Sequence, residues 1–166
     1  MSKLHYLLIP LLLFPAHATQ AADAGPVVRY TVQAKFEDVL DDVKSAITDR
    51  GLLIDHTSHV AKMLDRTGKD LGKTKKMFGE DQGWVFSFCS AVASRATMEA
   101  DPHNIAFCPY TLAVYATPAE PGKVHVAYRR LQRPDASPAS KAALMEVEKL
   151  LDGIVREALR IEEAKK

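Results

Sequence analysis

The chain has 166 residues, of which 47% are hydrophobic, 26% are charged and 7% are aromatic. These values are ordinary for one folded domain, and they exclude collagen, a coiled coil, intrinsic disorder and a protein with many membrane spans. The 22 lysines and arginines nearly balance the 21 acidic residues, which leaves a net charge of +1. Such a balance argues against a dedicated nucleic-acid-binding protein, which usually carries a basic stripe.

The N-terminal segment has the pattern of a secretory signal peptide. Lys3 gives a short positive start, an apolar stretch follows over residues 4–15, and small residues then lead to Ala21 at positions that a signal peptidase recognises. The apolar stretch is shorter than the roughly 20 residues of a membrane span. We therefore predict a signal peptide over 1–21, a flexible leader over 22–26 and a single domain over 27–164, in a periplasmic or secreted protein without a stable membrane anchor after cleavage.

The first half of the mature chain alternates between strand and helix patterns. Residues 27–34 alternate apolar and polar side chains, which is typical of a strand, and apolar residues then recur at helical spacing from Phe36 to Ile47. Gly51 follows this helix as a C-terminal cap. The expected elements are a strand over 27–34, a helix over 36–50, a strand over 52–56, a weaker helix over 60–66 stopped by Gly68, and a mobile glycine-rich loop over 68–83.

The second half adds the elements that decide the fold class. We expect a strand over 84–89, a helix over 90–100, strands over 105–117 and 123–131, and a long helix that begins at Ser137 and Pro138. A short turn joins the last two strands, so they must be antiparallel. One amphipathic helix can cover one face of such a sheet. The predicted fold is therefore α+β, with two layers and an antiparallel sheet covered by a long C-terminal helix.

Several short segments are similar to a known bacterial family. They are Phe36-Glu-Asp-Val39, Ala46-Ile47, Gly51-Leu52, Leu64-Asp-Arg-Thr67, Phe88-Cys-Ser-Ala91, Asp101-Pro102, Phe107-Cys-Pro-Tyr110 and Val126-Ala-Tyr-Arg129. Through them the chain resembles the family named domain of unknown function 302. The resemblance implies an α+β fold of the helix-grip, or TBP-like, type. It implies no settled activity, because the family is named for the lack of one.

The two cysteines are the first candidates for chemistry. Cys89 ends the strand over 84–89, and Cys108 lies early in the strand over 105–117. An even pair in an exported protein is typical of a structural disulfide, which would stabilise the fold by roughly 3 kcal/mol in the chain-entropy model. Two reduced thiols that pack as small hydrophobic groups, or a ligand or redox role, are the alternative interpretations.

The residues around the cysteines are candidates for a ligand-binding groove. Pro109 cannot donate a strand hydrogen bond, so it belongs at a strand start, an edge or a bulge. Such a break suits a pocket, and it equally suits an edge strand that proline protects from further pairing. The predicted groove would hold a small apolar ligand or a cofactor, and its lining would be Phe88, Cys89, Phe107, Cys108, Pro109 and Tyr110.

A metal or haem site is a weaker candidate. The sequence contains neither Cys-x-x-Cys-His nor His-Glu-x-x-His, which excludes covalent haem attachment and the zincin class of protease. Cys89, Cys108 and His103 remain weak candidates for binding copper or non-covalent haem, because thiolate and imidazole suit either. No hydrolase elbow, phosphate-binding loop or dinucleotide motif is present, so no catalytic residue is assigned.

Two basic groups are also noteworthy. Lys73, Lys75 and Lys76 form a patch on the expected loop, which is either a solvated surface or a contact for an anionic partner or membrane headgroup. Arg129 and Arg130, followed by Arg133, could bind a carboxylate or phosphate, or could pair with acidic helix ends.

These observations favour an exported small-ligand or cofactor binding module over an enzyme, with no nucleic-acid partner. One alternative is a thiol-based redox protein, or a haem or copper protein, that uses Cys89 or Cys108. A second alternative is a structural or interaction domain held by a Cys89–Cys108 disulfide.

Overall fold

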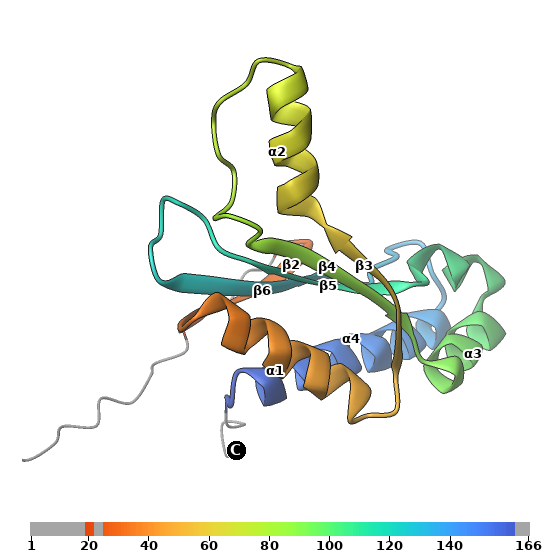
Figure 1. Cartoon of the computed structure of the whole chain (residues 1–166). Coiled ribbons are helices and arrows are strands. Elements are labelled where there is room, and N and C mark those ends of the chain that lie inside the picture. The colour runs from red at the N-terminus through yellow and green to blue at the C-terminus, as the bar shows by residue number, and fades with distance from the viewer. Residues whose placement is uncertain (1–18, 22–24, 162–166) are drawn as a thin grey trace, which may run out of the picture.

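The structure, a computed structural model, describes residues 19–21 and 25–161. The first 18 residues of the predicted signal peptide and most of the predicted leader lie outside the described residues. Six strands form one antiparallel sheet in the order β1-β2-β6-β5-β4-β3 (Figure 1). They are β1 (Thr19–Ala21), β2 (Val27–Gln33), β3 (Leu53–His59), β4 (Gly83–Cys89), β5 (Tyr110–Tyr115) and β6 (Lys123–Arg129).

The helices form the second layer and two additions to it. Helices α1 (Phe36–Thr48) and α4 (Pro138–Ala158) lie side by side against one face of the sheet (Figure 1). Helix α3 (Ala91–Ala100) and the 3-10 helix η1 (Pro102–Phe107) gather at one end of the sheet, where α3 contacts α4. Helix α2 (Val60–Asp70) projects away from the body. No helix within residues 25–161 is long and apolar enough to cross a bilayer.

The core lies between the sheet and the helix pair because the apolar patterns of both layers face each other. Alternate residues of β2 are buried, among them Tyr30, which is 0% exposed. Helix α4 buries the stripe that its sequence predicts, including Leu144, Val147, Leu151 and Ile154. The predicted two-layer α+β class, with an antiparallel sheet under the C-terminal helix, is confirmed.

Local capping explains several boundaries. The Ser90 side chain accepts a hydrogen bond from the Ala93 N–H at the start of α3, and Ser137 accepts one from the Ser140 N–H at the start of α4. Pro138 occupies the first turn of α4, as predicted. Gly51 follows α1 with φ of +70°, a conformation that glycine adopts without steric cost.

The structure corrects the prediction of a strand over 105–117. Residues 102–107 form η1, and β5 begins only at Tyr110, so Cys108 lies in the connection before the strand. The Asp101 carboxylate caps η1 by accepting from the His103 N–H at 2.9 Å. The buried Asn104 side chain then fixes the turn by donating to Thr97 O and Ser140 Oγ, both at 2.8 Å. These tertiary bonds override the apolar sequence.

The second helix is also longer than predicted. It passes through Gly68 and ends at Asp70, because a glycine inside a helix weakens it without stopping it. The chain turns back only after Gly72, whose φ is +62°. The Lys73 N–H donates to Gly68 O at 2.7 Å, which ties the returning segment to the helix.

Candidate ligand-binding site

Two neighbouring strands of the sheet separate at one end. The pairing of β5 with β6 runs from Tyr115 opposite His125 to Ala113 opposite Ala127, and it stops there. Beyond that point β5 stays paired with β4 as far as Tyr110, and β6 stays paired with β2 as far as Arg129. β5 and β6 therefore part from each other while each stays paired with its other neighbour, and a fork opens within the sheet.

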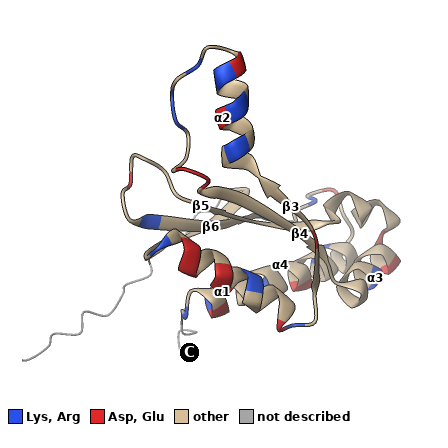
Figure 2. Ribbon diagram, in the orientation of Figure 1, with Lys and Arg blue, Asp and Glu red and all other residues tan. Residues whose placement is uncertain are grey.

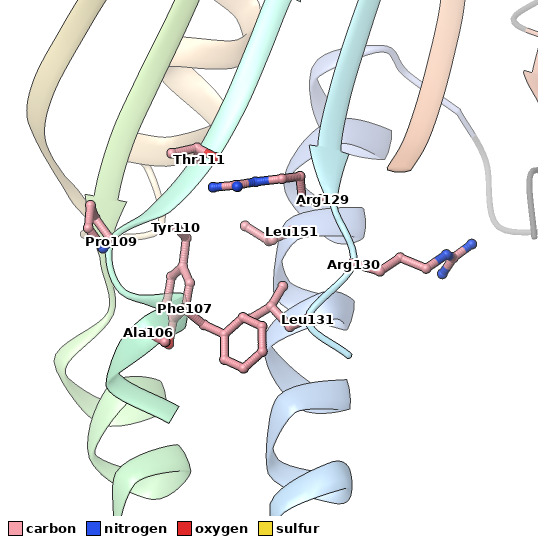
Figure 3. A pocket seen from close by; sticks show the side chains of 9 residues that line it. All are labelled: Ala106, Phe107, Pro109, Tyr110, Thr111, Arg129, Arg130, Leu131 and Leu151. Atoms are coloured by element: carbon pink, nitrogen blue, oxygen red, sulfur yellow. The ribbon is translucent and has the colours of Figure 1, made fainter. Parts of the chain in front are cut away.

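A cavity of about 180 Å³ occupies this fork (Figure 3). Residues from η1, β5, β6, α4 and the segments next to them surround it, and they are Ala106, Phe107, Pro109, Tyr110, Thr111, Arg129, Arg130, Leu131 and Leu151. The inner surface is apolar and belongs to the core, because Tyr110, Leu131 and Leu151 are 4%, 7% and 1% exposed. The cavity thus reaches from the end of the sheet where β5 and β6 separate toward α4.

Arg129 supplies the charge at this cavity. Figure 3 shows its side chain extending across the cavity toward Thr111, whereas the Arg130 side chain points away. Arg130 is occupied, since it pairs with Glu148 at 3.3 Å and donates from Nε to Gly25 O at 3.1 Å. Within the described residues, Arg129 makes neither an ion pair nor a side-chain hydrogen bond. Its guanidinium is therefore available to an anion that enters the cavity.

Arg133 has a structural role instead. It pairs with Asp101 at 2.6 Å and with Asp135 at 3.1 Å, and it donates to Asn104 Oδ1 at 3.3 Å. These contacts hold the chain after β6 against η1. Of the two interpretations of this arginine cluster, pairing with acidic residues describes Arg130 and Arg133, and anion binding stays open for Arg129.

The structure divides the six residues that were predicted to line a groove. Phe107, Pro109 and Tyr110 line the cavity, and the peptide bond between Cys108 and Pro109 is cis. Phe88 is 0% exposed and belongs to the core. Its ring packs edge-on against the Tyr110 ring, and the two ring centroids are 6.4 Å apart. Cys89 and Cys108 lie outside the lining.

The cysteines lie beside each other as free thiols, without a disulfide in this structure. Burial, followed by a hydrogen bond with Cys108, raises the pKa of Cys89 to about 11. The Cys108 Sγ also lies 3.7 Å from Ser94 Oγ, which in turn lies 3.2 Å from the Tyr110 hydroxyl. Reactive and metal-binding cysteines are thiolates with lowered pKa values, so this environment keeps Cys89 a thiol at neutral pH.

The structure does not assemble the weakly predicted metal site. Across residues 25–161, no group of three or more histidine, cysteine, aspartate or glutamate side chains could hold a metal ion. His103 is exposed near the start of η1, where its main-chain N–H bonds to Asp101. Cys89, Cys108 and His103 therefore do not form a metal-ligand set in this structure.

The part of the lining that depends on tertiary structure is not predictable from the sequence pattern. Thr111, Leu131 and Leu151 line the cavity but were not among the predicted lining residues. No pattern in the sequence predicts that β5 and β6 separate after Ala113 and Ala127. The run of Arg129 and Arg130 was the one signal that pointed to this end of β6.

The antiparallel sheet, the two helices on one face and the fork between two central strands define a small two-layer α+β protein. A family model described as "Domain of unknown function DUF302" matches residues 28–158, and the chain belongs to this family. No curated protein matches the chain.

A solved structure supports the same fold. The chain is similar to the "uncharacterized conserved protein DUF302 from Bacillus stearothermophilus", with a TM-score of 0.67 and 15% sequence identity. The similarity covers 81% of this chain and 99% of that one. At this identity the likeness shows the fold alone.

Proposed function

We propose that this protein is a binding module that takes a small organic carboxylate into the cavity between β5 and β6. The observation that carries the proposal is the Arg129 guanidinium, which extends across a cavity of mixed apolar and polar lining and has no ion-pair partner within the described residues. A ligand with an apolar body and one carboxylate matches both features. The carboxylate would meet Arg129 in charge-assisted hydrogen bonds, which are stronger than neutral ones.

The size of the cavity limits the ligand to a compact molecule. Drug-sized ligands occupy pockets of roughly 300–1,000 Å³, and an apolar cavity of about 150 Å³ in another protein holds one benzene. A cavity of about 180 Å³ therefore suits a single ring or a short chain. The Phe107 ring and the Leu131 and Leu151 side chains would contact the apolar body of such a ligand.

Benzoate is a suitable probe, and its binding can be followed by isothermal titration calorimetry. We expect benzoate to bind, and we expect Arg129→Gln to weaken its affinity about tenfold or more, because the loss of a hydrogen bond to a charged group has an effect of this size. Arg66→Gln on α2 is the matched control, because it removes the same charge from an exposed position outside the cavity.

Neutral benzamide has the shape of benzoate without its charge, and we expect it to bind the unchanged protein more weakly. The proposal is wrong if benzoate fails to bind, or if Arg129→Gln and Arg66→Gln bind it equally well.

We also propose that the protein is exported, which rests on the pattern of residues 1–21. After cell fractionation, the chain should be recovered outside the cytoplasm with an intact mass that lacks this segment. A full-length chain in the cytoplasm would contradict export. The same mass spectrum, taken without reductant, reports the cysteines, because a Cys89–Cys108 disulfide lowers the mass by two hydrogens, whereas the free thiols of this structure do not.

A further inference from the structure

The most prominent feature outside the cavity is a projecting arm, which we define as residues 60–77. It consists of α2 and the segment that returns from the helix tip, and it stands out from the sheet on the side away from α1 and α4 (Figure 1). Ala61 is the one buried residue of α2, and it sits at the base of the arm, where α2 contacts β4. The base is anchored and the rest of the arm faces solvent.

The arm carries an unusual share of exposed apolar side chains. Within the described residues, nine large hydrophobic side chains are exposed, and four of them belong to the arm. Leu71, at the tip, is 66% exposed, and Met63 and Met77 are 48% and 49% exposed. Single exposed apolar residues are common on protein surfaces, but a group of them on one projecting element indicates a contact surface.

The arm is also strongly basic in an otherwise balanced chain. It contains six lysines and arginines and two aspartates, for a net charge of +4, whereas the whole chain carries +1. Figure 2 shows basic residues on both the helix and the returning segment. Two of the six are paired, since Lys76 meets Asp65 and Lys62 lies 2.8 Å from Asp81. The other four, Arg66, Lys69, Lys73 and Lys75, have no acidic partner among the described residues.

We propose that the arm docks the protein on the surface of an anionic lipid bilayer. Leu71, at the tip, would enter the boundary between headgroups and acyl chains, while the lysines of the helix end and the returning segment would meet the lipid phosphates. Apolar side chains next to cations, on an element with a positive net charge, are the combination by which peripheral proteins bind such surfaces. A nucleic-acid partner fits less well, because the arm offers no aromatic side chain for base stacking.

The test is sedimentation of the protein, in the form that cells produce, with two kinds of lipid vesicle. One kind contains phosphatidylcholine alone, and the other contains equal parts of phosphatidylcholine and phosphatidylglycerol. We expect binding to the anionic vesicles only, with a loss of binding as salt rises. Binding that is equal on both vesicles, or absent from both, would overturn the proposal.

Variants separate the arm from the rest of the chain. Lys73→Gln with Lys75→Gln should weaken vesicle binding about 25-fold, at about fivefold for each charge removed near an anionic surface. Lys35→Gln with Lys141→Gln removes two exposed charges outside the arm and should change little.

The apolar contribution is tested in the same way. Leu71→Ser should weaken vesicle binding about tenfold, whereas Ile105→Ser, at an exposed position on η1, should not. Equal losses in the arm and control variants, or arm-dependent binding of an oligonucleotide in place of the vesicles, would assign the arm a different role.

Discussion

At the residue scale, Asp152 of α4 accepts hydrogen bonds from three side chains at the boundary of the core. Its Oδ1 accepts hydrogen bonds from the hydroxyls of Tyr30 and Tyr128, and its Oδ2 accepts from Arg156 Nε at 2.7 Å. Burial on its own would raise the pKa of Asp152, but the three donors outweigh it and hold the pKa below its ordinary value of 3.8. Burial and the neighbouring carboxylate raise the pKa of Tyr30 to about 12, and they raise the pKa of Tyr128 as well. Both hydroxyls therefore stay protonated and act as hydrogen-bond donors.

Asp152→Asn should therefore destabilise the protein in a pH-dependent way. Because the folded state lowers the pKa of Asp152, its contribution to stability is complete above pH 3.8 and is lost as the pH falls through the folded-state pKa. We expect a loss of about 1–3 kcal/mol in the free energy of unfolding at pH 7, from urea unfolding curves, with a smaller difference in acid. The control Glu146→Gln, in an exposed pair with Lys149, should change the free energy little. A loss that stays constant into acid would show that the carboxylate charge is not responsible.

At the element scale, η1 shapes the cavity, and its last three residues fall within the strand that the sequence predicted over 105–117. It presents Ala106 and Phe107 to the cavity, and one buried side chain, Asn104, joins it to α3 and α4. Asn104 is 1% exposed and its partner Ser140 is 0% exposed, so the polar groups of this junction depend on each other for hydrogen bonds.

Asn104→Ala should loosen this junction. It leaves the Ser140 hydroxyl and the Thr97 carbonyl without their Asn104 partner, which costs about 1–3 kcal/mol in the free energy of unfolding. Benzoate binding should weaken as well, because Phe107 loses its support. His103→Ala is the matched control, since its exposed side chain can be removed while its main-chain bond to Asp101 remains. A similar stability for both variants in urea unfolding would show that Asn104 does not hold η1.

At the scale of the whole molecule, the two proposed contact sites lie on different parts of one frame. The cavity opens where β5 and β6 part, and its inner surface is α4, a helix of the layer that covers the sheet. The arm extends from β3 and returns to β4, on the side of the sheet away from α1 and α4 (Figure 1). A ligand in the cavity and a bilayer under the arm would therefore use separate surfaces, so each proposal can fail without the other.

The sequence by itself determined the local elements and the fold class. Period-two and helical spacings gave β2, α1 and α4, and the caps at Ser90 and Ser137 are local interactions that a few neighbouring residues specify. The turn before β6 fixed an antiparallel pair, and the apolar stripe of α4 fixed the face that covers the sheet. Part of the cavity lining, namely Phe107, Pro109 and Tyr110, was also selected from the sequence.

Only the tertiary structure decided where the sheet forks and what each polar side chain meets there. The η1 turn depends on Asn104 and Arg133 bonds to residues far along the chain, and these bonds leave no periodic pattern in the sequence. The fork separates Arg129, which points across the cavity, from Arg130, which pairs with Glu148, although the two are identical and adjacent in the sequence. Arg129 is the last residue of β6 and Arg130 lies beyond it, so the role of each arginine is set by what packs beside it.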